Sequence, residues 1–336
     1  MDTIKKRRLR RRNLGLSVIF ILVITLGLTV FYVINKKNDF SEISDVEADY
    51  HTIEYNGQTY KYNTSIISLL ALGIDNNIDD PEDATLQGQS DVMELILFDR
   101  ENKRIELVGL QRDTMTEIEY TYLSRDQSAG WNVDHLCLAY ANGHGEQSGC
   151  MHAMQAVSRM LYNVPVVHYA SMNLNYLTQV HEIVGTLDIT LPDNTLKSYD
   201  ASWTKGATVT LTSSNVEKYL RTRDITVDGS AETRMERHRL YFDAYYKKLY
   251  EMLETDFNGT VSKLYSLVQN VTTNVSYEDL VSFANYTLEY DFDIASSYYT
   301  LPGKGVYGGE YDEYILDNDA LKGMVVKLFY KAKGND

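Results

Sequence analysis

The chain has 336 residues and a formal net charge of −15. Residues 1–13 contribute +6, from seven Lys or Arg residues and one Asp, so residues 14–336 carry −21. A body this acidic argues against nucleic-acid binding, because it offers no basic surface to a phosphate backbone. Any anionic ligand must be held locally, by a few Arg residues or by a metal ion.

The basic N-terminal cluster is followed by 21 residues, 14–34, without a charge. As a helix they would span roughly 31 Å, about the thickness of the hydrocarbon core of a bilayer. We predict a cytoplasmic basic tail at 1–13 and a single transmembrane helix at 14–34, with the rest of the chain outside the cell membrane. A cleaved signal peptide is the alternative, but the apolar run is too long and lacks a small-x-small cleavage site.

The segment after the apolar run, 35–50, is polar and acidic and is predicted to be a linker. A β-hairpin is expected at 51–64, because its central Asn56-Gly57 pair tolerates the positive φ angles of a two-residue turn. Residues 65–74 form a continuous apolar run that is typical of a buried central strand and leads into Asp75.

Alternating polarity predicts a second hairpin with strands at 92–98 and 104–110. Helical periodicity predicts helices at 146–161 and 174–184. The remaining predicted elements are a strand at 187–191, a short helix opened by a Ser214/Glu217 capping box and ending near 220, an amphipathic helix at 231–253 and a last helix at 320–330. Together these elements predict an α/β sandwich.

The only cysteines, Cys137 and Cys150, both follow the predicted membrane segment, in a compartment that permits disulfides. We predict a disulfide between them. Two buried free thiols are the alternative, and the spacing of the two residues fits no metal motif.

Candidate site residues gather at one end of the predicted sheet. Antiparallel pairing of the second hairpin places Asp91 roughly opposite Gln111-Arg112. The carboxylate of Asp75 reaches the same end if the buried strand runs beside and parallel to the second hairpin strand. Ligand sites are common at such strand ends, although a turn Asp or a surface Arg is the ordinary interpretation of each residue alone.

Two further groups of basic residues follow later in the chain. Arg221 and Arg223 are two apart, so in an extended segment their side chains lie about 6.5 to 7 Å apart on one face, a spacing that suits a diphosphate. A solvated charge run is the alternative. On the predicted long helix, Arg234 and His238 share one face, and Arg237 is expected to point elsewhere.

Two motif-like stretches are rejected. The Gly-x-Gly-x-x-Gly at 303–308 spells a dinucleotide-binding fingerprint, but it follows a proline and opens no helix. The start of residues 75–86 resembles a calcium loop, but its sixth position is not glycine and its twelfth is not glutamate. The seven His residues have no metal-ligand spacing, which argues against zinc.

In order and spacing, four motifs resemble the LytR-CpsA-Psr family over residues 65–255, with weaker similarity to 330. They are Leu69–Asp75, Ser90-Asp91, Gln111–Thr114 and Leu220–Asp224. A short cytoplasmic tail with one spanning helix is also the usual plan of that family.

The resemblance implies an extracytoplasmic catalytic domain at 65–332, an α-β-α sandwich with a central mixed sheet that holds a polyprenyl chain in an apolar tunnel. It implies a phosphotransferase that attaches a teichoic acid-like, capsular or other glycopolymer from a polyprenyl diphosphate carrier to peptidoglycan by phosphodiester formation. The implied site places the diphosphate among four Arg residues and Mg²⁺ at two Asp residues, which are Arg112, Arg221, Arg223 and Arg234, and Asp75 and Asp91. Either Asp is a candidate for the general base.

Three positions depart from the family pattern. Gln89 stands where the family often has Arg, His135 lies near a usual Lys, and His238 stands near a usual Gln. We expect all three residues to contact the substrate, and we expect their contacts with the lipid head group to differ from those of the family pattern. Two other functions remain open: a diphosphatase that uses water in the same pocket, and a non-catalytic lipid-binding regulator of the cell envelope.

Overall fold

The computed structural model describes residues 52–75, 88–122, 127–222, 230–256, 259–260, 263, 271–307 and 311–333. The tail, transmembrane helix and linker predicted at 1–13, 14–34 and 35–50 lie outside the described residues, as does Arg223. Among the helices that are described, none has the length and apolar character needed to cross a membrane.

A six-stranded mixed sheet forms the centre, in the order β11-β8-β3-β4-β5-β12. Its strands are β3 (Ile66–Asp75), β4 (Gln89–Asp99), β5 (Arg104–Leu110), β8 (His168–Asn173), β11 (Val271–Thr273) and β12 (Tyr298–Thr300). β3 is antiparallel to β4 and parallel to β8, while β5 is antiparallel to β4 and parallel to β12. The mixed central sheet expected from the sequence is therefore confirmed.

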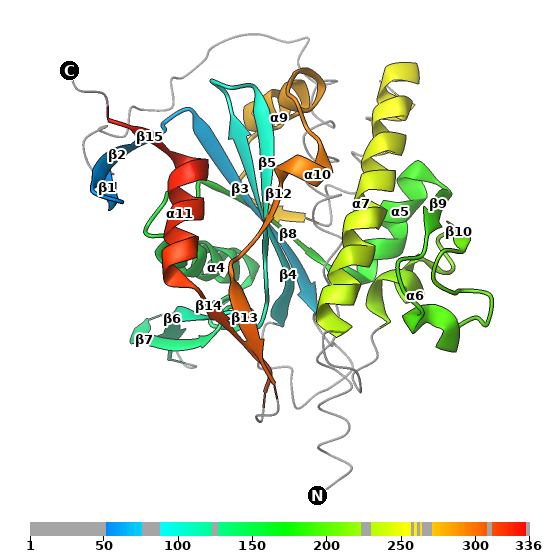
Figure 1. The fold of residues 1–336 in the computed structure, drawn as a ribbon, viewed down its shortest axis with the longest axis horizontal. Coiled ribbons are helices and arrows are strands. Elements are labelled where there is room, and N and C mark those ends of the chain that lie inside the picture. Colours follow the sequence, from blue (N-terminus) through cyan, green and yellow to red (C-terminus); the bar gives the residue numbers. More distant parts are fainter. Residues whose placement is uncertain are drawn as a thin grey trace, which may run out of the picture.

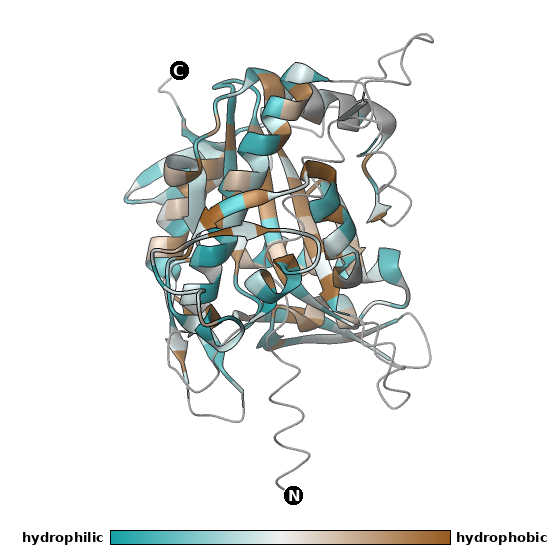
Figure 2. Ribbon diagram, turned by 90° about the vertical axis from the view of Figure 1, so that its right-hand side faces the viewer, coloured by the Kyte–Doolittle hydropathy of each residue, from teal (hydrophilic) through white to brown (hydrophobic). Residues whose placement is uncertain are grey.

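Helices cover both faces of the sheet because β3 and β4 are buried along nearly their whole length. Figure 1 shows α4 (Glu146–Met160) and α11 (Asn318–Phe329) on one side, with α5 (Leu177–Val184) and α7 (Ser230–Thr255) on the other. The hydrophobic residues lie mainly on the central strands and on the helix faces next to them (Figure 2). The arrangement is an α-β-α sandwich.

The predicted N-terminal hairpin is present as β1 (Thr52–Tyr55) and β2 (Gln58–Tyr62), with positive φ angles of 51° at Asn56 and 73° at Gly57. It does not stand alone, because β15 (Tyr330–Ala332) pairs with the other edge of β2. The first and last described segments of the chain thus form one small sheet.

Three further hairpins surround the sandwich. They are β6 (Met115–Thr121) with β7 (Ser128–His135), β9 (Leu187–Thr190) with β10 (Thr208–Leu211), and β13 (Gly303–Val306) with β14 (Glu313–Leu316). β14 contacts β6, so the first and third of these hairpins lie together, near the lower end of the sheet in Figure 1.

The remaining described helices are α3 (Leu138–Ala141), α6 (Val216–Arg221), α9 (Tyr277–Glu289), α10 (Ile294–Ser297) and the 3₁₀ turns Leu174–Tyr176 and Thr195–Ser198. The capping box predicted for α6 is wrong, because its N-cap is Asn215 and makes no side-chain capping bond. A capping box that the sequence reasoning missed opens α9, where Ser276 and Asp279 cap each other.

The predicted disulfide is also wrong, since Cys137 and Cys150 are both free and buried. The Sγ atom of Cys137 lies 3.5 Å from Nη2 of Arg112, whereas the Cys150 thiol in α4 interacts with Ser171 of β8. The two sulfurs face different neighbours, and burial raises the pKa of each thiol to about 12.

Candidate functional site

The candidate site lies where β3 and β5 end and β4 begins. β3 and β5 run in the same direction, which meets one part of the condition set for Asp75, but β4 lies between them, so the two strands are not neighbours. Asp75, the last residue of β3, pairs with Gln89, the first of β4. The ends of β3 and β5 and the start of β4 still meet at one edge of the sheet.

Asp91 owes its position to a β-bulge. The register of β3 against β4 shifts between Gly73 and Ile74, because Gly73 pairs with Val92 and Ile74 with Ser90. Asp91 is the extra residue, and such bulges re-aim a side chain next to a site. Its side chain is only 2% exposed.

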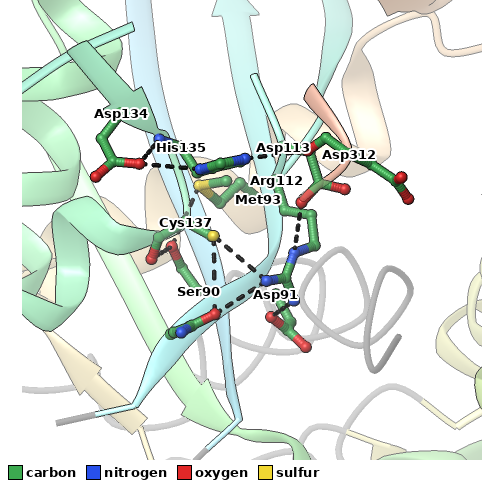
Figure 3. A network of polar contacts seen from close by, with 10 residues as sticks. Ser90, Asp91, Met93, Arg112, Asp113, Asp134, His135, Cys137 and Asp312 are labelled. Atoms are coloured by element: carbon green, nitrogen blue, oxygen red, sulfur yellow. Dashed lines mark hydrogen bonds and ion pairs between the residues drawn. The ribbon is translucent and has the colours of Figure 1, made fainter. Parts of the chain in front are cut away.

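Arg112 lies just beyond β5 and connects the carboxylates of the site. Its Nη1 donates to Asp91, its Nη2 donates to Oε1 of Gln89 at 2.9 Å, and its Nε donates to Oδ1 of Asp113 at 3.2 Å (Figure 3). Together with the contact to Cys137, these bonds give each side-chain nitrogen of Arg112 a partner and so fix the orientation of the guanidinium plane. The predicted meeting of Asp91 with Arg112 is therefore confirmed.

The electrostatics join five predicted residues into one cluster. Burial raises the pKa of Asp91 to about 7, with Asp75 adding to the rise and Arg112 and Arg234 opposing it. Burial likewise raises the pKa of Asp75, and Arg221 and Arg112 oppose it. Burial disfavours the charge of Arg112, but Asp91, Cys137 and Asp113 together outweigh that effect and leave the pKa of Arg112 above its ordinary range.

The negative charge of Asp75 helps to raise the pKa of Asp91, so two like-charged carboxylates oppose each other at this edge of the sheet. A cation between them would relieve that repulsion. Within the described ranges there is no group of three or more His, Cys, Asp or Glu side chains arranged to hold a metal ion. Two carboxylates nevertheless fit Mg²⁺, which commonly takes one or two protein carboxylates and fills its other positions with water and substrate phosphates.

Arg221 departs from the expected extended conformation, because it is the last residue of α6. Its Nη1 donates to Oε1 of Glu217 at 2.5 Å, one helical turn back. The chain becomes extended at Thr222, with φ −69° and ψ 129°. Arg223 lies outside the described residues, so the predicted pairing of the two guanidiniums stays a prediction.

α7 brings Arg234 and His238 to the buried side of the molecule, as their shared face predicted. Arg234 acts electrostatically on Asp91, whereas Nε2 of His238 lies 2.9 Å from the carbonyl oxygen of Leu220 in α6. In the part of the chain that the structure describes, His238 therefore supports α6, and its predicted contact with substrate is untested.

Arg237, expected to point elsewhere, is instead 1% exposed. Its Nη2 donates to the carbonyl oxygen of Thr222, and its Nη1 lies 3.6 Å from Oδ1 of Asp193. Sequence reasoning missed this residue because an Arg on an amphipathic helix is normally solvated. The one available signal was its position three residues after Arg234, next to the same helix face.

His135 is held in the wall of the site. Its Nδ1 lies 2.9 Å from Oδ1 of Asp134, and its Nε2 lies 3.0 Å from the carbonyl oxygen of Asp312 (Figure 3). The ring thus links β7 to the β13–β14 hairpin. No local pattern in the sequence indicates this link, since the two segments lie 177 residues apart.

The chain is similar to known proteins over most of its length. The model of the LytR_cpsA_psr family matches residues 29–329. The polyisoprenyl-teichoic acid–peptidoglycan teichoic acid transferase TagU of Enterococcus faecalis is 26% identical over 269 residues, which are 80% of this chain and 78% of that protein.

Two solved structures share the fold. TagV of B. subtilis has a TM-score of 0.57 at 17% identity, over 79% of this chain and 97% of that one. A structure described as TagT bound to LIIa-WTA has a TM-score of 0.55 at 21% identity, over 79% of this chain and 90% of that one.

Proposed function

This chain belongs to the LytR_cpsA_psr family, and from that membership we propose that it is a phosphotransferase that moves a glycopolymer from a polyprenyl diphosphate carrier onto peptidoglycan. The TagU relative, named as a teichoic acid transferase, favours a teichoic acid-type polymer over a capsular one. The observation that carries the proposal is the buried ion pair of Asp91 with Arg112, in electrostatic contact with Asp75, Arg221 and Arg234.

The cluster suits transfer between phosphate oxygens. A sugar hydroxyl of the wall attacks the phosphorus next to the glycan, the bond from that phosphorus to the bridging oxygen breaks, and polyprenyl phosphate leaves with the electron pair. Such in-line transfer depends mainly on positioning and on neutralising charge. Arg112 and Arg234, which are buried, and Arg221, which is partly buried, supply positive charge in a setting where it acts more strongly than in water.

The hydroxyl proton needs an acceptor near the attacked phosphorus. Asp91 is fully buried and bonded to Arg112, whereas Asp75 is only partly buried at the end of β3. An acceptor sugar that arrives from solvent therefore meets Asp75 first. We assign the general base to Asp75 and a positioning role, through Arg112, to Asp91.

Mg²⁺ is the proposed cofactor, held by the carboxylates of Asp75 and Asp91 together with phosphate oxygens of the substrate. When bound, the ion would supply charge neutralisation on the diphosphate. The mutual repulsion of the two carboxylates supports this assignment.

The proposed location is the cell membrane, with a single pass. The uncharged segment 14–34 would anchor the chain, the basic residues 1–13 would stay in the cytoplasm, and the catalytic domain at 65–332 would face outward. In this arrangement the diphosphate of a membrane-embedded polyprenyl carrier and the wall acceptor lie on the same side as the site. The polyprenyl chain would lie in the apolar interior of the sandwich.

The test is transfer from a synthetic polyprenyl diphosphate glycan to a peptidoglycan acceptor by the full-length protein in detergent. Arg221→Ala should slow turnover by on the order of 10² to 10³ with little change in melting temperature. Asp75→Asn should remove turnover, and excess Mg²⁺ should not restore it.

Near wild-type transfer by both variants would overturn the proposed site. Product analysis with and without acceptor separates transfer from hydrolysis by water, because a diphosphatase releases the phosphorylated glycan at the same rate in both reactions. A non-catalytic regulator would retain its phenotype after loss of both Asp75 and Asp91.

A further inference from the structure

The β13–β14 hairpin is bonded directly to the wall of the candidate site. The backbone N–H of Tyr314 donates to the carbonyl oxygen of Asp113 at 2.8 Å, and the side chain of Asp113 accepts from Nε of Arg112. A second link joins Nε2 of His135 to the carbonyl oxygen of Asp312 (Figure 3). The hairpin therefore holds a fixed position beside the guanidinium that is proposed to bind diphosphate.

Two glycines make room for tyrosine rings on one face of this hairpin. A Cβ atom on Gly303 would collide with the ring of Tyr314, and one on Gly305 would collide with the ring of Tyr307. Residues two apart on a strand share a face, so these rings cover the same side of β13. The Gly-x-Gly pattern that resembles a nucleotide motif thus serves aromatic packing.

Tyr307, whose ring packs over Gly305, and Tyr311, whose ring contacts His135, are both widely exposed, and we call this pair the tyrosine platform. Their exposed fractions are 44% and 46%. The ring of Tyr311 meets that of His135 edge to face, with 6.0 Å between centroids, so the platform adjoins the site. Large exposed aromatic side chains that are fixed in position are a common feature of binding surfaces.

The charges around the platform restrict its partner. The described residues of the hairpin carry one base, Lys304, and two acids, Asp312 and Glu313. A phosphate-rich polymer or an anionic lipid surface would be repelled by this balance. An uncharged sugar ring would not be repelled, because its C–H face can pack on a phenol ring while its hydroxyls bond to carboxylate and phenol oxygens.

We infer that the tyrosine platform binds the uncharged sugar rings of the acceptor glycan and orients its hydroxyl toward the site. The inference rests on the proposed function, because it names the surface that holds the second substrate. A transfer enzyme needs such a surface to favour a sugar hydroxyl over water, since water is present at far higher concentration. Holding the acceptor in place makes the attack effectively intramolecular.

The experiment uses full-length protein in nanodiscs that contain the synthetic donor, with soluble uncrosslinked glycan-strand oligosaccharides as acceptor. The test variant is Tyr307→Ala with Tyr311→Ala, and the conservative variant changes both residues to Phe. The matched control is Tyr199→Ala, because Tyr199 is 45% exposed and packs edge to face on Trp203, within the β9–β10 region.

We expect the double Ala variant to raise the KM for acceptor by about tenfold or more, with a much smaller change in kcat, because stacking contributes to binding. The double Phe variant should regain most of the affinity, and Tyr199→Ala should match the wild type. An unchanged acceptor KM in the double Ala variant would overturn the inference. If the KM for the lipid-borne donor rises instead, the platform contacts the membrane and the inference is equally overturned.

A direct binding measurement separates this inference from the proposed function. Fluorescence anisotropy with labelled glycan strands needs no turnover, so it decides on the platform even if the wild-type protein transfers nothing. Binding by the wild type that weakens about tenfold in the double Ala variant supports the platform. Equal binding by both proteins contradicts it.

Discussion

Arg112 is the residue on which the site geometry depends most, because each of its side-chain nitrogens has a partner. A lysine cannot reproduce this planar set of bonds. We predict that Arg112→Lys lowers transfer by at least 10² and lowers the free energy of unfolding by about 3 kcal/mol, since Asp91 would be left buried with a weaker partner. Transfer rate and chemical denaturation measure the two effects.

The matched control is Arg104→Lys, since Arg104 also pairs with a carboxylate, that of Glu106 at 2.9 Å, but is about half exposed. An exposed pair of this kind contributes little. Equal losses in the two variants would mean that the geometry around Arg112 has no special role.

Glu94 provides a second test at the scale of one residue. It is buried in β4, its Oε1 accepts a hydrogen bond from Tyr298 at 3.1 Å, and burial raises its pKa to about 8. The unfolded chain, with an ordinary glutamate pKa near 4.5, releases this proton first as the pH rises. Glu94 therefore makes the protein less stable as the pH rises from about 4.5 to 8, and the loss is complete above pH 8.

The prediction is that Glu94→Gln removes this pH dependence. The variant should unfold with roughly the same free energy as the wild type at pH 5 and should be more stable by about 2 kcal/mol or more at pH 9. Urea denaturation at the two pH values measures the difference. A constant difference between the proteins at both pH values would show that Glu94 does not titrate in this range.

At the scale of elements, α7 is joined to the end of α6 by contacts between side chains and backbone carbonyl oxygens. Arg237 donates to the carbonyl of Thr222, His238 contacts that of Leu220, and the Tyr219 hydroxyl donates to the carbonyl of Arg237 at 3.1 Å. Thr222 directly follows Arg221, so these bonds fix the backbone from which the Arg221 side chain extends. Arg237 is thus a positioning residue for the proposed site.

We predict that Arg237→Met, which keeps the apolar volume, lowers kcat by about tenfold or more and raises the KM for donor, because the support of Arg221 is lost. Arg237→Lys should restore part of the rate. Arg239→Met is the control, since Arg239 lies two residues away and pairs with Glu236 at the surface. A loss of stability without any change in the kinetics of the folded fraction would contradict the positioning role.

The elements that could be predicted are those with a strong local signal. The continuous apolar run of β3, the Asn56-Gly57 turn and the long periodic pattern of α7 each specify their element without tertiary help. The α6 cap was misassigned by one residue, because Ser214 and Asn215 are both good N-caps and tertiary packing decides between them.

The site could be predicted only in part. The antiparallel pairing of the second hairpin was enough to predict that Asp91 lies near Arg112. The bulge that turns Asp91 inward could not be predicted, because it depends on pairing with β3, which no local pattern specifies. The disulfide prediction failed because it rested only on the prediction that both cysteines lie on the same side of the membrane, which does not determine whether their thiols lie next to each other. The burial of Arg237 and the link from His135 to Asp312 depend on contacts between distant segments.

At the scale of the whole molecule, the N-terminal hairpin is part of the domain. The N–H of Asn63 donates to the carbonyl of Phe329 at 2.8 Å, and that of Lys333 donates to the carbonyl of Thr59 at 3.2 Å. The rings of Tyr62 and Tyr330 also meet edge to face, at 5.8 Å between centroids. The hairpin therefore pairs edge to edge with the C-terminal strand β15.

We predict that a chain beginning near residue 40 is soluble and folds alone, whereas one beginning at residue 65 melts roughly 4 to 8 °C lower, because β15 loses its partner. Thermal unfolding of both proteins, followed by circular dichroism, measures the difference. Equal melting temperatures would show that the hairpin is dispensable. Aggregation of the longer form, with full-length protein well behaved in detergent, would contradict an independent domain.

The same small sheet brings the two ends of the domain together. Thr52 in β1 and Lys331 in β15 both pair with Lys61 of β2, one on each side. With neighbouring strands about 4.8 Å apart, the two ends lie within about 10 Å of each other. A linker of a few residues could join them, and the chain could then be opened at a surface turn as a circular permutant. The place of the proposed membrane attachment could in this way be moved around the molecule while the order of the central strands is kept.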